Sequence, residues 1–263
     1  MKNLFLVSLA FFALAAAASE PKTQEPNSEK EAFLSARYEG VKKSCAQKDA
    51  KACKRVVRFY KKGAAQRSEK DVRAATEILN KMCGEKEFAA CAALGEIYIK
   101  DKNFAAAREI LSPACKDGYP DACAIYGLSF EAKAAEDRDE RRAVSLYESA
   151  CESGSAIGCE HLGISYKDGS DVERGLSYLR KACKIDARSC FSLGVTSAPY
   201  GFSDAIEALK KNCYETQMLV GCLMLADIYD TQRLDSDEAE IKRLYARLCE
   251  LMPYEKKYCE KAR

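Results

Sequence analysis

The 263-residue sequence contains no tryptophan, a single histidine and only 6 prolines. A catalytic metal site built on histidines needs several of them, and one histidine cannot form such a cluster. Net charge is also nearly absent, because 42 lysines and arginines stand against 40 aspartates and glutamates. This balance gives no long-range attraction to nucleic acid or to an anionic membrane. We therefore expect no metal ion, no cofactor and no nucleic-acid partner.

Motifs of common hydrolases and thiol enzymes are missing as well. Ser-Asp-Asn, Lys-Thr-Gly and Gly-x-Ser-x-Gly do not occur, and the one Ser-x-x-Lys, at Ser19–Lys22, contains a proline and lies near the N-terminus. No Cys-x-x-Cys motif marks a redox-active thiol pair. The single histidine, His161, precedes an expected core position, which predicts a partly buried, satisfied ring rather than a catalytic base. No catalytic residue is indicated, and the sequence argues against an enzyme.

Long apolar runs are absent beyond the N-terminus. That terminus reads MKNLFLVSLAFFALAAAAS, with a lysine at position 2, an apolar stretch over residues 4–14 and small residues after it. The order is typical of a signal peptide (residues 1–18), and the apolar run is shorter than the about 20 residues of a spanning helix. Residues 19–31 are polar with two prolines, which predicts a flexible tether. We expect an exported protein, periplasmic or secreted, without membrane contact after cleavage.

Cysteine, by contrast, is abundant, and the 14 cysteines fall into seven successive pairs. The members of a pair are 7 to 10 residues apart, most often 8, and successive pairs follow at steps of 30 to 38 residues. A step of this size repeated along the chain indicates an internal helical repeat. The pairs are Cys45/Cys53, Cys83/Cys91, Cys115/Cys123, Cys151/Cys159, Cys183/Cys190, Cys213/Cys222 and Cys249/Cys259.

The spacing within a pair decides whether it can form a disulfide. On one continuous helix the two cysteines would stand about 12 Å apart, whereas a disulfide needs Cα atoms about 4.4–6.8 Å apart. Intervening stretches such as KDGYPDA and ESGSAIG contain turn-forming residues, so the chain can reverse between the cysteines. Zinc is the alternative, but zinc sites usually use closer cysteines or histidine partners. Together with export, the spacing predicts seven local disulfides, each joining the end of one helix to the start of the next.

The segments that flank each pair have the periodicity of amphipathic helices. After the second cysteine, large apolar residues recur at the third and seventh places, and a small residue usually takes the fourth place. Before the first cysteine, leucine or tyrosine stands four places away and a small residue usually stands eight places away. Each unit is therefore predicted as helix–turn–helix, and the small residue would let the neighbouring helix approach closely. The fourth-place residues are Val57, Gly95, Gly127, Gly163, Gly194 and Ala226.

The pattern A-x-x-C-x-x-L-G-x-x-Y, followed by a second helix ending in A-C, resembles the Sel-one-like repeat (SLR), a relative of the tetratricopeptide repeat. The paired cysteines are similar to the cysteine-rich, secreted Hcp-type branch of that family. The resemblance implies an all-α fold over residues 32–263, a right-handed α/α superhelical solenoid of about seven disulfide-stapled helix-turn-helix repeats, and a monomer. Some relatives carry the label penicillin-binding protein or β-lactamase, so a β-lactam hydrolase is the alternative function that the resemblance implies.

Solenoids usually bind through their concave surface. By analogy with tetratricopeptide repeats, the helix after each second cysteine lines that groove with the places −2, +1, +5 and +8 counted from the cysteine. These places are basic in the first repeat and then apolar, with acids toward the C-terminus. The resulting candidate binding residues are Lys51, Lys54, Arg58, Lys61, Glu160, Phe191, Leu223 and Asp227. Further groove places are Glu96, Ile99, Leu128, Glu131, Ile157 and Ile164.

The groove pattern leads to a functional expectation, a non-catalytic interaction protein. A protein or peptide ligand with an acidic end and apolar side chains would complement these places, and such ligands include a peptidoglycan fragment or a host protein. The alternative for the stretch from Lys51 to Lys61 is a solvated helix face without a ligand.

Overall fold

The computed structural model describes residues 28–61, 69–132, 135, 138–168, 171–216, 218–232 and 237–263. Within these ranges the chain is helical and contains no strand. The predicted signal peptide, residues 1–18, lies outside the described residues, as does most of the predicted tether. The first described helix, α2, begins at Ser28, so the last four residues of the segment predicted as a tether are helical.

The described helices follow one another as antiparallel hairpins joined by short turns. In chain order they are α2 (Ser28–Ala46), α3 (Ala50–Lys61), α4 (Glu69–Gly84), α5 (Phe88–Lys100), α6 (Phe104–Lys116), α7 (Pro120–Glu131), α8 (Glu140–Glu152), α9 (Ala156–Asp168), α10 (Val172–Ile185), η1 (Ala187–Ser189), α11 (Cys190–Ser197), η2 (Ala198–Tyr200), α12 (Phe202–Glu215), α13 (Leu219–Gln232), α14 (Glu238–Leu251) and α15 (Lys256–Lys261).

A disulfide staples each of the seven hairpins at its turn. The Cα–Cα distances lie between 4.3 and 4.8 Å, because the chain reverses between the two cysteines of each pair. No cysteine is free. A loop this short contributes about 2–3 kcal/mol per bridge in the chain-entropy model. The bridges are Cys45–Cys53, Cys83–Cys91, Cys115–Cys123, Cys151–Cys159, Cys183–Cys190, Cys213–Cys222 and Cys249–Cys259, as the spacing predicts.

The four pairs with a separation of eight share one turn geometry. The third residue after the first cysteine has a positive φ in each: Lys48 (64°), Lys86 (65°), Gly118 (87°) and Gly154 (93°). Its backbone N–H donates to the carbonyl of that cysteine, at 2.9 to 3.2 Å. In the pairs separated by seven and nine residues, the third residue has an extended backbone instead. The common separation of eight thus reflects a common left-handed turn.

Small residues at the fourth place allow the helices of successive hairpins to pack closely. A Cβ atom added at Gly127 would lie 2.6 Å from Cε1 of Tyr147, and one added at Gly163 would lie 2.8 Å from the carbonyl oxygen of Gly175. Both distances are shorter than real side-chain contacts. The residue met at Gly95, Gly127, Gly163 or Gly194 is the buried leucine or tyrosine four places before the next pair. The packing role predicted for the small residue is therefore confirmed.

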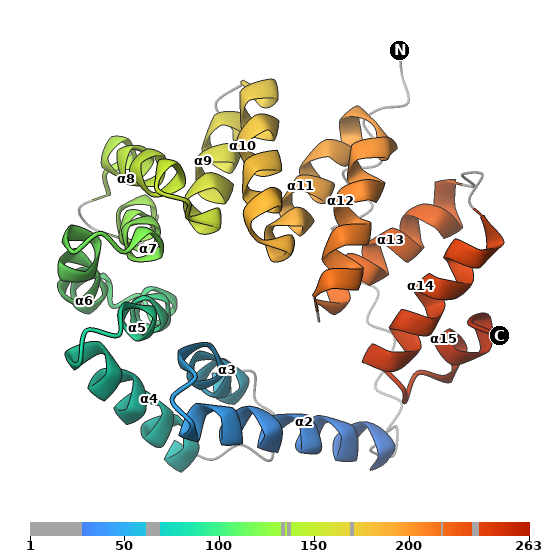
Figure 1. The fold of residues 1–263 in the computed structure, drawn as a ribbon, viewed down its shortest axis with the longest axis horizontal. Helices are drawn as coiled ribbons and strands as arrows, with labels where there is room; N and C mark the ends of the chain where they lie inside the picture. Colours follow the sequence, from blue (N-terminus) through green and yellow to red (C-terminus); the bar gives the residue numbers. More distant parts are fainter. Residues whose placement is uncertain are drawn as a thin grey trace, which may run out of the picture.

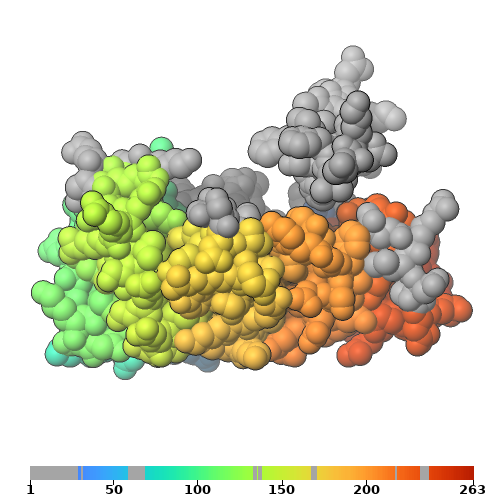
Figure 2. Space-filling view, turned by 90° about the horizontal axis from the view of Figure 1, so that it is seen from above, coloured from blue at the N-terminus to red at the C-terminus, as the bar shows by residue number. Residues whose placement is uncertain are grey.

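The hairpins curve because their two layers pack differently. The inner helices α3, α5, α7 and α9 contact one another in succession, whereas the outer helices α4, α6 and α8 make little contact with each other. Figure 1 shows the resulting arc, and Figure 2 shows the later hairpins side by side in chain order. The arc brings α2 to the last turn, where the rings of Phe33 and Tyr254 lie 5.9 Å apart. The predicted all-α superhelical solenoid is confirmed.

Candidate functional site

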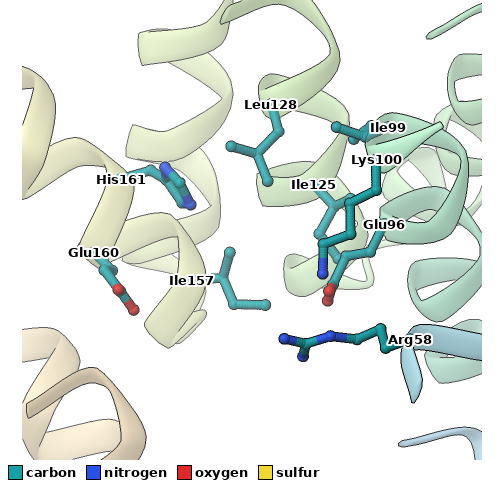
Figure 3. Close-up of a pocket in the computed structure, with 9 residues that line it drawn as sticks. All are labelled: Arg58, Glu96, Ile99, Lys100, Ile125, Leu128, Ile157, Glu160 and His161. Atoms are coloured by element: carbon teal, nitrogen blue, oxygen red, sulfur yellow. The ribbon is translucent and has the colours of Figure 1, made fainter. Parts of the chain in front are cut away.

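The inner helices α3, α5, α7 and α9 line a cleft of about 380 Å³, called cleft one. Its centre is aliphatic, and Figure 3 shows Ile125, Leu128 and Ile157 between charged groups on two sides. Arg58 enters from α3, and Glu160 belongs to the opposite wall on α9. The full lining is Arg58, Glu96, Ile99, Lys100, Ile125, Leu128, Ile157, Glu160 and His161. Cleft one therefore offers an apolar surface with charges of both signs at its rim.

The basic face predicted on α3 divides into residues with different roles. Arg58 is exposed and lines cleft one. Lys54 is largely covered, and its Nζ atom lies 2.6 Å from Oε1 of Glu96, so its charge is already paired. Lys51 is exposed but does not line a described cleft, and the side chain of Lys61 lies outside the described part of the structure.

A second cleft, of about 250 Å³ and called cleft two, lies among α13, α14 and α15. It contains two more candidates, Leu223 and Asp227. Phe191 is half-buried and packs against the apolar core of the C-terminal hairpins. Of the candidates predicted as one groove, Arg58 and Glu160 thus line cleft one, and Leu223 and Asp227 line cleft two. The lining of cleft two is Leu223, Ala226, Asp227, Asp230, Tyr245, Lys257, Tyr258 and Lys261.

Glu160 on α9 is held by hydroxyl groups. Ser189 Oγ donates to Oε2 of Glu160 at 2.7 Å, and Ser192 Oγ donates to the other carboxylate oxygen. The two serines lie on η1 and α11, which follow α10 in the chain. A carboxylate that accepts two hydroxyl hydrogen bonds keeps a defined position without needing a cation. Glu160 therefore presents a fixed negative charge at the wall of cleft one.

Three cleft-one residues fall outside the four groove places, and sequence reasoning missed them as ligand contacts. Ile125 and His161 both stand two places after a second cysteine, and Lys100 stands nine places after one. The second place adjoins the buried third place, so a helical wheel assigns it to the boundary between core and groove. Ile125 and His161 stand at the same place in two successive repeats, and this recurrence is the sequence signal that could have identified them. The polarity of the two residues gives no such signal.

His161 is partly buried, as expected, but stacking holds it rather than a hydrogen bond. Its ring stacks on Tyr147 with centroids 5.3 Å apart, and its Nδ1 atom lies 3.8 Å from Oε2 of Glu131. Burial lowers the pKa of His161, and the nearby carboxylates of Glu131, Glu160 and Glu96 oppose that effect. Because the net shift is downward from about 6.5, the imidazole is neutral at pH 7.

Tyr147 connects this stack to Glu131. Its hydroxyl donates to Oε2 of Glu131 at 2.6 Å, while its ring is fully buried. Burial and the hydrogen bond to Glu131 both raise the pKa of Tyr147, so the hydroxyl stays protonated and remains a donor. Glu131 therefore lies beside His161 of cleft one with one carboxylate oxygen bound to a neutral donor.

Cleft two contains a related cluster. The hydroxyl of Tyr245 donates to Asp230 at 3.0 and 2.9 Å. Lys261 completes the cluster, because its Nζ atom lies 3.1 Å from Oδ2 of Asp230 and 2.8 Å from the Tyr245 oxygen. The hydrogen bond to Tyr245 leads the contacts that raise the pKa of Lys261, so the ammonium is charged. This carboxylate is neutralised within the chain.

Neither cleft is accompanied by a metal-binding cluster or a membrane helix in the described part of the chain. No group of three or more His, Cys, Asp or Glu side chains there could hold a metal ion. None of the described helices has the length and apolar character to cross a membrane.

Comparisons with known proteins find similarity only among solved structures. No family model and no curated protein matches the chain. A Sel1 repeat protein from Oxalobacter formigenes is similar with a TM-score of 0.47 and 20% identity over 66% of this chain and 79% of that chain. The C-terminal part of a TPR repeat-containing protein from Cytophaga hutchinsonii gives a TM-score of 0.43 and 16% identity over 72% of this chain and 78% of that chain.

A third structure is c5321, a protective antigen of uropathogenic Escherichia coli strains displaying an SLR fold. It gives a TM-score of 0.49 and 21% identity over 81% of this chain and 48% of that chain, so this chain spans about half of its length. Helical-repeat names of the kind expected from the sequence thus recur among the neighbours. The seven bridged hairpins of its own structure make the chain a cysteine-rich helical-repeat solenoid, and Sel1 repeat and TPR repeat proteins are among the structures to which it is similar.

Proposed function

We propose that this chain is an exported, non-catalytic interaction protein that binds a segment of a partner protein or peptide in cleft one. The observation that carries the proposal is the composition of that cleft, in which an aliphatic centre is flanked by Arg58 on one side and by Glu160 on the other. Glu131 lies behind His161 of the lining, 3.8 Å from its Nδ1 atom. Aliphatic side chains of a partner would be removed from water there, and the rim charges would set its orientation.

The partner chemistry follows from the positions of the charges. Arg58 has an exposed guanidinium with no acidic partner among the described residues, so it favours a carboxylate of the partner. Lys54 is already paired with Glu96 and offers less. We infer that the segment places an acidic residue against α3 and an aliphatic side chain over Ile125 and Ile157. A stretch of a host protein or a peptide attached to peptidoglycan has this chemistry.

Export is part of the same proposal. Seven disulfides are typical of proteins that fold in an oxidising compartment, and the N-terminal residues 1–18 have the composition of a signal peptide. We propose a periplasmic or secreted chain that acts as a monomer after cleavage. The bridges stabilise a solenoid whose individual hairpins each bury little apolar surface.

The test is partner capture with a charge reversal in cleft one. The oxidised mature chain would be cross-linked in envelope extract and with host proteins, in parallel with Arg58→Glu and with Arg141→Glu on the exposed surface of α8. We expect specific partners that Arg58→Glu loses and Arg141→Glu retains. Partners that both variants retain equally would contradict binding in cleft one. Sustained turnover of a chromogenic β-lactam by the folded protein would contradict the non-catalytic proposal.

A further inference from the structure

The same tyrosine–carboxylate pair occurs at two equivalent places in the solenoid. Tyr147 and Tyr245 each stand four places before the first cysteine of a pair. Their hydroxyls donate to Glu131 and Asp230, which each stand eight places after the second cysteine of the preceding pair. In both cases an outer helix thus sends a hydroxyl between its neighbours to a carboxylate on the inner helix.

The small fourth-place residue makes this passage possible. At Gly127 the ring of Tyr147 lies where a side chain would otherwise be. Tyrosine and the acid also occur together in the sequence. Where leucine replaces the tyrosine, the eighth place of the preceding repeat carries no carboxylate. The leucines are Leu79, Leu111, Leu179 and Leu209, and the residues at the eighth place are, in the same order, Lys61, Ile99, Lys167 and Ala198. The pair is therefore a coupled feature of two repeats and not a general property of the helix surface.

A third residue completes each pair, and here the two clusters differ. It stands two places after the second cysteine of the next inner helix, and it is His161 in one cluster and Lys261 in the other. The ammonium of Lys261 lies 4.5 Å from the ring centroid of Tyr245 and 3.1 Å from Asp230. His161 stacks on Tyr147 but stays 3.8 Å from Glu131. Asp230 is thus paired with a permanent cation, and Glu131 is not.

Glu131 consequently keeps a negative charge without a permanent cation, next to His161, which lines cleft one. Its side chain is 36% exposed, and no lysine or arginine nitrogen of the described residues lies within ion-pair distance of it. The Tyr147 hydroxyl donates a hydrogen bond to Oε2 of Glu131 and carries no charge that would neutralise it. The aliphatic floor made by Ile125, Leu128 and Ile157 adjoins His161 in the same cleft. An exposed charge next to an apolar floor matches the two ends of an alkylammonium group.

We propose that Glu131, held by Tyr147, binds a primary ammonium group from a partner, either a lysine side chain or an N-terminal amine, with its alkyl part on the floor of cleft one. The chain itself contains an example of this contact, because the ammonium of Lys261 binds Asp230, the acid at the equivalent place, at 3.1 Å. The inference deepens the proposed function, because it names the basic group of the segment that would bind there.

His161 makes this site sensitive to pH, because a protonated imidazole would compete with the ammonium for Glu131. The charged and titratable groups around it are Glu131 on α7, Tyr147 on α8, Glu160 on its own helix, Glu96 and Lys100 on α5, and Arg58 on α3. Burial keeps His161 neutral to lower pH than usual. Ammonium binding should therefore be constant from pH 8 to 7 and weaken on acidification below the ordinary histidine pKa of about 6.5.

The test uses hexylammonium as the probe and the oxidised chain as the receptor. The chain has one histidine, so the Hε1 proton of the His161 ring gives one imidazole Hε1 signal, which reports directly on the cleft. At pH 7.5 we expect a saturable shift of this signal with hexylammonium and none with 1-hexanol or hexanoate. Saturating hexylammonium should also lower the pKa of His161, because the bound cation opposes its protonation.

Variants separate the site from non-specific binding, with saturation-transfer NMR of hexylammonium as the readout. Glu131→Gln should weaken binding at least tenfold, and Tyr147→Phe should weaken it severalfold. His161→Lys installs the arrangement of the other cluster and should abolish binding by occupying Glu131 internally. Glu109→Gln on the exposed surface of α6 is the matched control and should bind as wild type does. Far-UV circular dichroism would show that each variant is folded.

Equal binding of 1-hexanol, or unchanged binding by both Glu131→Gln and His161→Lys, would overturn the proposal. Either variant suffices if the other fails to fold. The outcome is separable from that of partner capture. Hexylammonium binding without any captured partner would support the ammonium site and contradict the proposed function. Captured partners whose binding depends on Arg58 but not on Glu131 would support the proposed function and contradict the ammonium site.

Discussion

Replacing Gly163 by alanine tests the close helix packing on which the curvature of the solenoid depends. The added Cβ would lie 2.8 Å from the carbonyl oxygen of Gly175 and 2.8 Å from Cγ of Leu179. The leucine can change rotamer, but the carbonyl belongs to the backbone of α10 and can move only with that helix. At Gly95 the nearest atoms all belong to a side chain, and at Gly194 the nearest backbone atom, the carbonyl oxygen of Ala205, is 3.3 Å away, so Gly163 is the more demanding position.

The magnitude is the difference between two effects. Overpacking a tight contact costs about 1–3 kcal/mol, and replacing glycine by alanine inside a helix returns about 1 kcal/mol. The backbone contact places the cost in the upper part of its range, so we expect Gly163→Ala to destabilise the fold by about 1–2 kcal/mol. For a chain of this size that lowers Tm by roughly 2–8 °C.

Gly40→Ala is the matched control, because Gly40 is also helical but has no atom within 4 Å of an added Cβ. It should gain about 0.5–1 kcal/mol from helix propensity alone. Thermal melting by circular dichroism with the disulfides intact would compare the two variants, and amide exchange would show whether the loss at Gly163 is confined to α9 and α10. A Gly163→Ala protein that melts at or above the wild-type temperature would refute the packing argument.

Three further predictions concern the turns, a buried asparagine and the histidine. Lys86→Gly should stabilise the chain by about 1 kcal/mol and Gly118→Ala should destabilise it by a similar amount, because both residues have a positive φ and Gly118 has open space around it. The midpoints of urea unfolding should therefore shift in opposite directions, and shifts in the same direction would contradict the argument. Gly221→Ala should be among the most destabilising substitutions, since its Cβ would lie 2.0 Å from Oδ1 of Asn212, and adding Asn212→Ala should recover part of the loss in thermal melts; no recovery would contradict this contact as the cause. Burial lowers the pKa of His161 in the folded chain. On acidification the unfolded chain therefore takes up a proton first, below pH about 6.5, and the free energy of unfolding decreases until the pH reaches the lowered pKa of the folded chain. Tm measured from pH 7.5 to 5 should fall less for His161→Gln than for wild type, and parallel curves for the two proteins would contradict this prediction.

The fold could be predicted from the sequence because its strongest signals are local. Each cysteine pair is short enough that only a reversal of the chain can close it, and the four pairs with a separation of eight use one left-handed turn. The fourth-place glycines were predictive for a similar reason, since a residue without a side chain leaves space that only a neighbouring helix can fill. These arguments need no knowledge of distant contacts.

The site was predicted less completely, because periodicity gives the direction of a side chain and not the groups already bound to it. Lys54 has a groove place in the repeat pattern, yet its ammonium pairs with Glu96 on the next inner helix. Phe191 has a groove place but packs into the C-terminal core. The hydroxyls that hold Glu160 come from Ser189, which lies within the cysteine pair with the atypical separation of seven, and from Ser192, which lies just after it. The pairing of Lys54, the packing of Phe191 and the hydrogen bonds of Glu160 all depend on contacts between repeats. The pattern within one repeat contains no information about these contacts.

The tyrosine–carboxylate pairs lie between these two cases. Their co-occurrence could have been read from the sequence, since both tyrosines stand four places before the first cysteine of a pair and both acids stand eight places after the second cysteine of the preceding pair. What the sequence could not give is the distance of the third residue, because lysine reaches the acid at 3.1 Å whereas the stacked histidine remains 3.8 Å away. That difference leaves one carboxylate without a permanent cation. In a solenoid built from nearly equivalent repeats, the residue at one recurring place thus decides whether the acid of the neighbouring repeat is paired within the chain, and the proposed ammonium site depends on this difference.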